Sequence, residues 1–453
     1  MKKYILIILF FSFNLYTHAQ DFITRWDLSI AGSGATQLTF GVGTSGTCSY
    51  TWETIPAGAT GTGTFTGNTI NINGLPANAM IRLKIDTTNF NRINIDNGID
   101  KNRLKDVEQW GGVTWNSMQR AFLGCKNLNC TATDIPDLSL VTDMSYMFYY
   151  CTLFSGPLNI DNWNTANVTD MSYLFYFDPS FDRPIGNWNT ANVTNMSHMF
   201  EFAQFFNKPI GNWNTANVTN MENMFYLASH FNQPIGNWNT ENVTNMRRMF
   251  SSADFFNQSL DNWNTGNVID MSDMFAGSPA FNQPIGNWPL NSNVIMTSML
   301  YLSGLDCNNY SSTLLGWSNN LNIPSGRTLG ANNLKYSPSA QNARDYLVNT
   351  KGWTINDDSI DNNCNGIGLN DHNLSNNIKI FPNPVSQNLQ IESEIRLQNA
   401  EICLLNMMGQ TIGTYNNIST NKWTVDMSAL ARGNYFIQIK DASHSFVKQV
   451  HKE

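Results

Sequence analysis

The chain has 453 residues, of which 42 % are hydrophobic and 12 % are aromatic, so it can form several packed domains. Only 13 % of the residues are charged, which excludes long charged tails and a coiled coil. The formal net charge of −8 makes nucleic acid an unfavourable partner, because a negatively charged protein repels phosphate groups.

The first residues have the pattern of a secretory signal peptide. Two lysines precede an apolar run from Tyr4 to Phe13, and small residues lead to a cleavage site after Ala19. This run is too short to span a membrane, which takes about 20 apolar residues, and no later segment is comparable. We therefore predict a signal peptide over residues 1–19, export from the cytoplasm and no transmembrane span.

A repeat with a period of 25 residues dominates the middle of the chain. Six tryptophans follow this period, namely Trp163, Trp188, Trp213, Trp238, Trp263 and Trp288. Two series of phenylalanines share it, one from Phe175 to Phe275 and the other from Phe181 to Phe281. Because one coil of this length is too small to fold alone, the repeat predicts coils that stack on one another.

Each repeat contains two patterns of secondary structure. Met196, Met199 and Phe200 lie at positions i, i+3 and i+4, which is typical of one face of a short helix. The segment that follows contains an isoleucine and the repeat tryptophan in a short extended run. We therefore predict a mixed α/β solenoid, similar to leucine-rich repeats, with one short strand and one short helix per coil over residues 111–300.

The segments on either side of the repeats have different patterns. Residues 20–110 are rich in Gly, Thr and Ile and alternate in polarity, which predicts an all-β sandwich domain. Residues 301–355 stay apolar but lose the repeat, as expected of a C-terminal cap on the solenoid. Residues 356–375 are polar and predict a linker, whereas residues 376–453 alternate with period two and predict a second all-β sandwich.

The predicted linker contains three acidic residues, Asp357, Asp358 and Asp361. Carboxylates bind calcium, but the spacing of these three does not match the EF-hand pattern. The sequence leaves two alternatives, a solvated linker and a calcium site, and we expect the first.

The repeat resembles a known family of surface proteins. The phrase NWNTANVTNMSHMF, with its FNQPI lead-in, is similar to the BspA-type leucine-rich repeats in the variant with Trp and Met-Phe in each copy. The resemblance covers roughly residues 115–355. It implies an exported protein that acts in adhesion and binding, without catalysis.

Four motifs near the C-terminus resemble the type IX secretion C-terminal sorting domain. They are IFPNP at residues 380–384, the turn at 408–410, LARGNYF at 430–436 and the terminal FVKQVHKE. The residues carried over from this resemblance are Pro382, Asn383, Pro384, Gly409, Gly433, Tyr435 and Lys448. The resemblance implies that the type IX secretion machinery recognises this domain in the periplasm and delivers the protein to the outer cell surface or the medium.

The sequence contains no arrangement of residues that points to catalysis. The motifs of serine hydrolases, zinc proteases and nucleotide-binding loops are absent. Acidic residues occur at unrelated positions of the coils, so we expect no carboxylate pair for glycoside hydrolysis. We expect a protein that is not an enzyme and that holds no cofactor or metal.

Positions that vary between copies of the repeat mark the outer surface of the coils. The candidate contact residues at these positions are Tyr176, Phe177, Phe202, Tyr226, Arg247 and Arg248. Aromatic residues anchor many interfaces, so this surface is expected to bind a protein or a glycan at the cell exterior. The alternative is that the aromatic residues only pack against the edges of the coils.

The sequence therefore predicts a secreted or cell-surface protein that binds or adheres through its solenoid. One alternative is a glycan-binding protein for polysaccharide capture, with residues 20–110 as the binding module. A second alternative is a polysaccharide-degrading enzyme built on the solenoid.

Four of the seven cysteines have positions that bear on pairing. Cys125 and Cys151 each follow the repeat phenylalanine by three residues, so we expect them in neighbouring coils. Neighbouring strands lie about 4.8 Å apart, which is within the range of Cα separations that a disulfide can bridge. A bridge and two buried thiols stay equal alternatives, because alanine takes the same position in later coils. Cys307 and Cys364 bracket the cap, and we predict a bridge between them.

Overall fold

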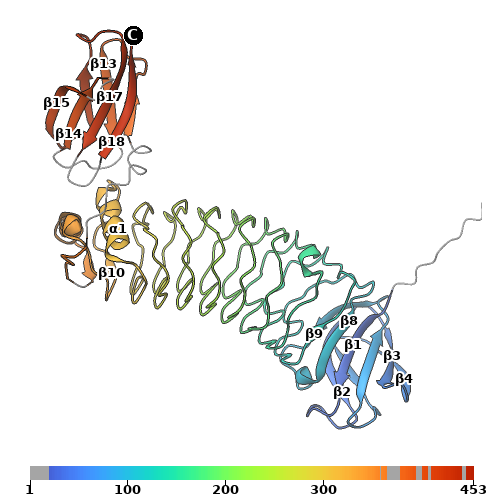
Figure 1. Ribbon diagram of the computed structural model, residues 1–453. Coiled ribbons are helices and arrows are strands. Elements are labelled where there is room, and N and C mark those ends of the chain that lie inside the picture. Colours follow the sequence, from blue (N-terminus) through green and yellow to red (C-terminus); the bar gives the residue numbers. More distant parts are fainter. Residues whose placement is uncertain (1–19, 358, 365–377, 394–399, 407–409, 441–444) are drawn as a thin grey trace, which may run out of the picture.

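The computed structural model describes residues 20–357, 359–364, 378–393, 400–406, 410–440 and 445–453 (Figure 1). The predicted signal peptide and Gly409 lie outside the described residues, as do Asp358 and most of the predicted linker. Two separate hydrophobic cores organise the chain. The first core runs from Phe22 to Ile355 and the second from Ile378 to Val450. The N-terminal sheets and the repeats therefore share one continuous core.

Two sheets, antiparallel except for the pairing of β8 with β9, form the N-terminal part. One three-stranded sheet has the order β5 (Thr69–Ile72), β2 (Leu38–Thr44), β7 (Phe90–Asn94). The larger sheet has the order β4 (Thr60–Phe65), β3 (Cys48–Ile55), β6 (Met80–Ile85), β1 (Phe22–Asp27), β8 (Leu104–Gln109), β9 (Asn129–Cys130). Residues of β1 and β6 alternate between buried and half-buried positions, as their sequence alternation requires. Strand β9 belongs to the first coil and pairs in parallel with β8, so this sheet leads directly into the repeats.

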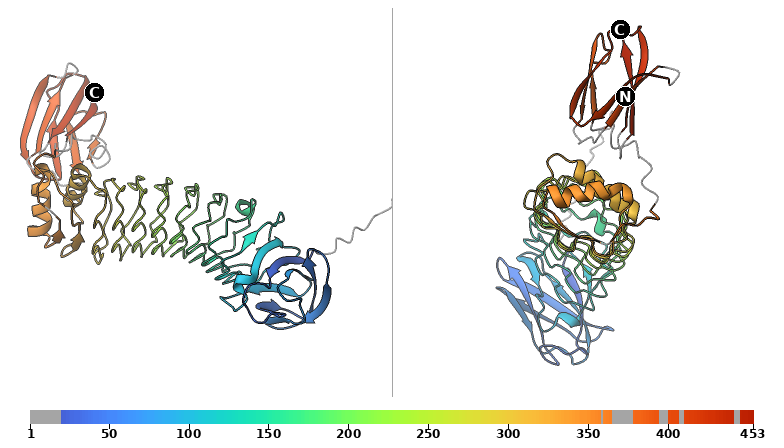
Figure 2. Two further views of the ribbon diagram at one scale, coloured as in Figure 1. Left: turned by 60° about the horizontal axis from the view of Figure 1, so that its bottom comes forward. Right: turned by 90° about the vertical axis from the view of Figure 1, so that its left-hand side faces the viewer.

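The repeats form a row of open coils that lie side by side (Figures 1 and 2). Equivalent residues of successive coils are joined by isolated parallel bridges, such as Asp170 with Asn195 and Asn195 with Asn220. Backbone bonds between coils follow the same register, because the N–H of Met196 donates to the carbonyl of Asn220 at 3.0 Å. Apart from β9 and one turn of 3-10 helix, η2 (Ile160–Asn162), the repeats consist of turns, bridges and irregular segments.

The predicted mixed α/β solenoid is wrong. The Met196–Phe200 segment is not a helix, because His198 and Phe202 have φ angles of 61° and 60°, in the left-handed region. The N–H groups of His198 and Phe200 donate to the next coil instead of to a helical partner four residues earlier. In the described residues both α-helices, α1 (Cys307–Asn319) and α2 (Gln341–Asp345), follow the repeats. The fold consists mostly of β-structure in several separate sheets.

Aromatic side chains form continuous columns in the core of the coils. One column contains Phe122, Phe148, Phe175, Phe200, Phe225, Phe250 and Phe275, with successive ring centroids 5.6–5.8 Å apart. A second column, from Phe154 to Phe281, lies beside it, and Phe225 and Phe231 stack across the two at 3.9 Å. Each column therefore places one identical ring per coil directly over the last.

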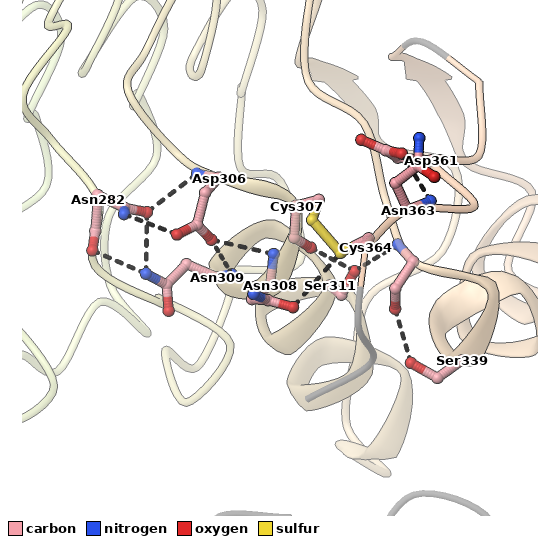
Figure 3. The surroundings of a disulfide bond; sticks show 11 residues. Asn282, Asp306, Cys307, Asn308, Asn309, Ser311, Ser339, Asp361, Asn363 and Cys364 are labelled. Carbon is pink, nitrogen blue, oxygen red and sulfur yellow. Dashed lines mark hydrogen bonds between the residues drawn. A yellow bond between two sulfur atoms is a disulfide. The ribbon is translucent and has the colours of Figure 1, made fainter. Parts of the chain in front are cut away.

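Polar side chains also form a ladder along the coils. The side-chain oxygens of Asn207, Asn232 and Asn257 each accept a bond from the backbone N–H of the residue 25 positions later, at 2.9–3.0 Å. The last rung joins Asn282 to the N–H of Asp306, whose own carboxylate caps the first turn of α1 (Figure 3). The ladder thus fixes where the capping helix begins.

The last coils are covered by helical segments and a small parallel sheet. These are α1, η3 (Pro338–Ala340), α2, η4 (Tyr346–Thr350), and the pair β10 (Thr328–Gly330) and β11 (Thr354–Asn356). A disulfide joins Cys307 at the start of α1 to Cys364 (Figure 3). Asp357 is buried and pairs with Arg344 at 2.6 Å, which ties the segment before Cys364 to α2. Of the three acidic residues considered for calcium, Asp357 therefore has its carboxylate paired with Arg344.

The C-terminal part is built from two sheets with a core of their own. The three-stranded sheet has the order β12 (Ile378–Phe381), β13 (Asn388–Ser393), β16 (Lys422–Asp426). The four-stranded sheet has the order β15 (Thr411–Ile418), β14 (Ala400–Leu405), β17 (Gly433–Lys440), β18 (Ser445–Lys452). Among the helices that the structure describes, none is long and apolar enough to cross a membrane.

One buried carboxyl group interrupts a column of small side chains. Cys125, Cys151 and Ala203 are buried in this column, and Asp178 takes the same position in its own coil. No donor meets either carboxyl oxygen of Asp178 in hydrogen-bond geometry. Burial raises the pKa of this carboxyl well above its ordinary value, and the nearby backbone N–H groups of Ser180 and Phe181 offset this only in part.

Replacing Asp178 by alanine is expected to raise the free energy of unfolding at pH 7 by about 2 kcal/mol, because a buried polar group without a partner is removed. With a raised folded-state pKa, the wild-type protein loses stability as pH rises above the ordinary aspartate pKa. The stability that the alanine variant gains over the wild type should therefore be smaller at pH 4 than at pH 7. Urea unfolding at both pH values measures it, with Asp178→Asn, which keeps the polar group, as the control. A less stable alanine variant at pH 7 would contradict this prediction.

Candidate functional site

Partly exposed aromatic rings form three short columns on the outer surface of the early coils. We call their members together the aromatic face: Tyr146, Tyr173 and His198 in the first column, Tyr149 and Tyr176 in the second, Tyr150, Phe177 and Phe202 in the third, and Tyr226 at the end. Tyr149 and Tyr176 stack at 4.4 Å with an interplanar angle of 3°. Rings in these columns cover each other's faces, so the surface presents ring edges and phenol hydroxyls.

The backbone conformation explains why these side chains point outward. Tyr150, Phe177 and Phe202 have φ angles of 61°, 53° and 60°, and Tyr173 and His198 are left-handed as well. Residues other than glycine rarely adopt this conformation. Here it recurs in every coil because the N–H of each such residue donates to the next coil, as Phe177 does to Glu201 at 2.8 Å. The same bonds that stack the coils therefore turn these rings away from the core.

Two central tyrosines of the aromatic face, Tyr173 and Tyr176, have raised pKa values. Burial, followed by the nearby Glu201 carboxylate, raises the pKa of Tyr176 to about 12, and burial together with Tyr146 raises the pKa of Tyr173 further. Glu201 is itself 5 % exposed, and its side chain contacts the ring of His198 and accepts a bond from Asn223. These tyrosines therefore act as hydrogen-bond donors and acceptors, without charge.

The structure brings together four of the six predicted contact residues. Tyr176, Phe177, Phe202 and Tyr226 are all half-buried members of the aromatic face. They pack against one another along the coil edges and stay partly exposed. That they contact a partner stays a prediction. The basic pair lies further along the stack, where Arg247 bonds Glu222 at 3.3 Å and Arg248 bonds Asp273 at 3.2 Å.

Sequence reasoning missed the N-terminal half of the aromatic face, namely Tyr146, Tyr149 and Tyr150. These tyrosines lie 27 residues before Tyr173, Tyr176 and Phe177, and this irregular spacing hides their register. Counting back from the repeat phenylalanine, Phe148, places them correctly. That count would have revealed the columns.

The two cysteines considered for a bridge within the coils are separate thiols. Cys125 and Cys151 are both free and fully buried, and the thiol of Cys151 donates to the carbonyl of Phe122 at 3.1 Å. Burial raises the pKa of both thiols. They therefore serve as small core residues, like the alanines of later coils.

Most of the described residues that resemble the sorting domain lie where β17 begins and β18 ends, and Lys448 lies in the middle of β18. Pro382, Asn383 and Pro384 form the turn between β12 and β13. The Asn383 side chain accepts the N–H of His451 at 2.8 Å, which joins this turn to the last strand. Gly433 opens β17, Tyr435 donates its hydroxyl hydrogen to the carbonyl of Ala431 at 2.9 Å, and Lys448 pairs with Ile437 in the register of β18 with β17.

The part of the chain that the structure describes offers no group of three or more His, Cys, Asp or Glu residues that could hold a metal ion. Asp361 is used locally, since its side chain accepts the N–H of Asn363 at 2.9 Å.

Two family models match the chain. Residues 116–233 and 206–313, which span the repeats, match a family described as Mycoplasma protein of unknown function, DUF285. Residues 379–453 match the secretion system C-terminal sorting domain. No curated protein matches the chain. The BspA leucine-rich-repeat identity is not confirmed by these matches. The C-terminal sheets are thus a type IX sorting domain, and the chain is a secreted or cell-surface protein.

Proposed function

We propose that this protein is a non-catalytic binding protein of the cell exterior that contacts its partner through the aromatic face. The observation that carries the proposal is the gathering of nine ring-bearing side chains, all half-buried, over four adjacent coils. Aromatic residues are enriched in protein interfaces relative to the rest of the protein surface. Tyrosines are also enriched among the residues that dominate interface energies.

The rigidity of the aromatic face favours binding. Each ring is held by its neighbours in the column, as Tyr146 and Tyr173 are at 4.4 Å, so little side-chain freedom remains to be lost on association. Columns of hydroxyl groups at fixed spacing supply hydrogen bonds that orient the partner. The non-catalytic part of the proposal rests on the missing catalytic motifs in the sequence.

Replacing Tyr149 and Tyr176 by serine is expected to weaken binding of the partner at least about 30-fold, the effect of losing one interface anchor. The mature protein would be screened by biosensor against extracellular-matrix proteins and by glycan array, and each interaction found would be measured again with the variant. The control replaces Phe205 and Phe255, which are 55 % and 57 % exposed in a separate row beside His230. Loss of binding in the control variant alone would show that the partner binds outside the aromatic face.

Export is expected to depend on the sorting domain. A chain that ends before Ile378 lacks the second core, and the first core is complete without it, so the truncated protein should fold and stay in the periplasm. Cell fractionation shows in which compartment the truncated and the full chain are found. C-terminal sequencing of the full chain taken from the cell surface is expected to show that the sorting domain has been removed. Surface delivery of the truncated chain would contradict the role of residues 378–453.

A further inference from the structure

A second row of rings lies on the coils, outside the aromatic face. Phe205 and Phe255 are 55 % and 57 % exposed, and the exposed His230 lies between them in the intervening coil. Successive ring centroids are 5.1 Å and 5.4 Å apart, so the three rings form a continuous line along the stack of coils. We call Phe205, His230 and Phe255 the exposed row.

The fold does not need rings at these positions. Each member of the exposed row belongs to the turn before a core phenylalanine, and in the first of these turns the N–H of Phe206 donates to the carbonyl of Ala203 at 3.2 Å. In the preceding and following coils Ser180 and Ala280 take the same place, and the turn bond is kept there at 3.3 Å and 3.1 Å. The large rings therefore add apolar surface that the turn does not require. A ligand that covers them gains the free energy of removing this surface from water.

The rings of the exposed row leave their faces open. Neighbouring rings are tilted by 46° and 50° to each other. In the aromatic face, by contrast, rings such as Tyr149 and Tyr176 are nearly parallel and cover one another. The face is the negative part of an aromatic ring, so it attracts the C–H groups on the flat side of a sugar. The exposed row can therefore stack on sugar rings, whereas the columns of the aromatic face present mainly ring edges.

Polar groups flank the exposed row. Because each coil crosses the row, the residues just before and just after each ring lie on opposite sides of it. Asn232 follows His230 by two residues, and among the described residues none bonds its Nδ2, since only its oxygens take part in the ladder. The exposed Gln204 and Asp254 lie on the other side. The His230 ring donates from Nδ1 to the carbonyl of Gln204 at 2.9 Å, which holds the ring in place. The row is thus an apolar strip one ring wide with hydrogen-bonding edges.

The spacing of the rings favours an extended sugar chain. A polymer that follows the row meets one ring every 5.1–5.4 Å. An extended β-1,4-linked chain advances by this distance per sugar, so successive sugars stay over successive rings. Side chains on one face of an extended peptide are about 6.6 Å apart and lose this register within a few coils. An amphipathic helix needs a groove with apolar walls, whereas this strip has polar edges.

We propose that the exposed row binds a neutral, linear β-1,4-linked polysaccharide that lies along the stack of coils. Such a chain is a ribbon with apolar faces and hydroxyl groups along its edges, which matches the apolar strip and its polar flanks. The net charge of −8 and the exposed carboxylate of Asp254 repel an acidic chain. This inference goes beyond the proposed function, because it adds a second ligand on a separate surface.

The test measures binding of cellohexaose to the mature protein by calorimetry. Maltohexaose is the matched probe, because it contains the same six sugars in an α-1,4-linked chain that curves away from a straight row. Cellohexaose should bind at least about tenfold more tightly. Chitohexaose, the second β-1,4-linked probe, differs in one substituent per sugar, and the tighter of the two β-1,4-linked probes identifies the polysaccharide.

Variants connect this binding to the exposed row. Replacing Phe205 and Phe255 together by serine should weaken cellohexaose binding at least about 30-fold, because two stacking rings are lost. Replacing Tyr149 and Tyr176 by serine should leave it unchanged and is the matched control. Ala280→Phe adds a fourth ring to the row and should tighten binding at least about threefold. An unchanged melting curve for each variant shows that the coils are intact.

Equal affinity for cellohexaose and maltohexaose, or no binding of any β-1,4-linked probe, would overturn the proposal. Equal losses in the two double variants would also overturn it, because the glycan would then not distinguish the exposed row from the aromatic face. Absence of glycan binding, while another partner still depends on Tyr149 and Tyr176, would reject the exposed row and leave the proposed function standing.

Discussion

Replacing Phe225 by alanine is expected to lower the free energy of unfolding of the repeats by about 4 kcal/mol. Phe225 is fully buried and stacks on Phe200 at 5.6 Å, Phe250 at 5.7 Å and Phe231 at 3.9 Å. The truncation opens a cavity in the middle of both phenylalanine columns, and neighbouring coils cannot close it without breaking their hydrogen-bonded register. Urea unfolding followed by tryptophan fluorescence measures the loss.

Phe205 supplies the matched control for this prediction. It lies in the adjoining coil and is 55 % exposed, so Phe205→Ala removes the same atoms from the surface. The expected change is within about 0.5 kcal/mol. Similar losses at the two positions would show that the columns do not carry the stability of the stack.

The period of the repeat correctly predicts which side chains stack, because residues one period apart must occupy the same place in successive coils. The columns that contain Phe200 and Phe206 follow directly from this spacing. The backbone conformation between these residues does not follow from the spacing. The i, i+3, i+4 spacing of Met196, Met199 and Phe200 suits a helix, but it suits equally a series of turns that sends the same three side chains inward.

The deciding feature is a backbone angle that the residue types at His198 and Phe202 do not reveal. Other copies of the repeat carry the sign instead, because Gly124, Asn223 and Gly277 stand at equivalent positions with positive φ angles, and glycine and asparagine adopt this conformation most readily. At the other residue types the bonds to the next coil make the conformation favourable. Comparing the copies at these positions would therefore have indicated turns instead of a helix.

The candidate site could likewise be predicted from the sequence only in part. Tyr176 and Phe202 could be chosen from sequence, because they vary where the repeat is otherwise constant. Tyr146 and Tyr149 were missed, because two extra residues before Phe175 hide their register unless the count starts from Phe148.

Deleting residues 211–235 is expected to give a folded protein that is shorter by one coil. The deletion joins Ile210 to Gly236, and the phrase Gly-Asn-Trp-Asn-Thr then follows as it did before, because residues 211–215 and 236–240 are identical. Every column loses one member and keeps its register. Circular dichroism and urea unfolding should show the same cooperative transition with a smaller slope, since less surface is exposed on unfolding.

Deleting only residues 211–222 removes fewer atoms but should abolish the folded repeats. This half-coil deletion places polar loop residues opposite the phenylalanine columns and breaks both the backbone bonds and the ladder that runs from Asn207 to Asn282. Natural irregularities are much smaller, since Phe122, Phe148 and Phe175 are separated by 26 and 27 residues and still stack. Loops absorb one or two residues outside the columns, whereas half a coil displaces the columns themselves. A stable half-coil variant would show that the stack tolerates loss of register, and that the period has another cause than stacking.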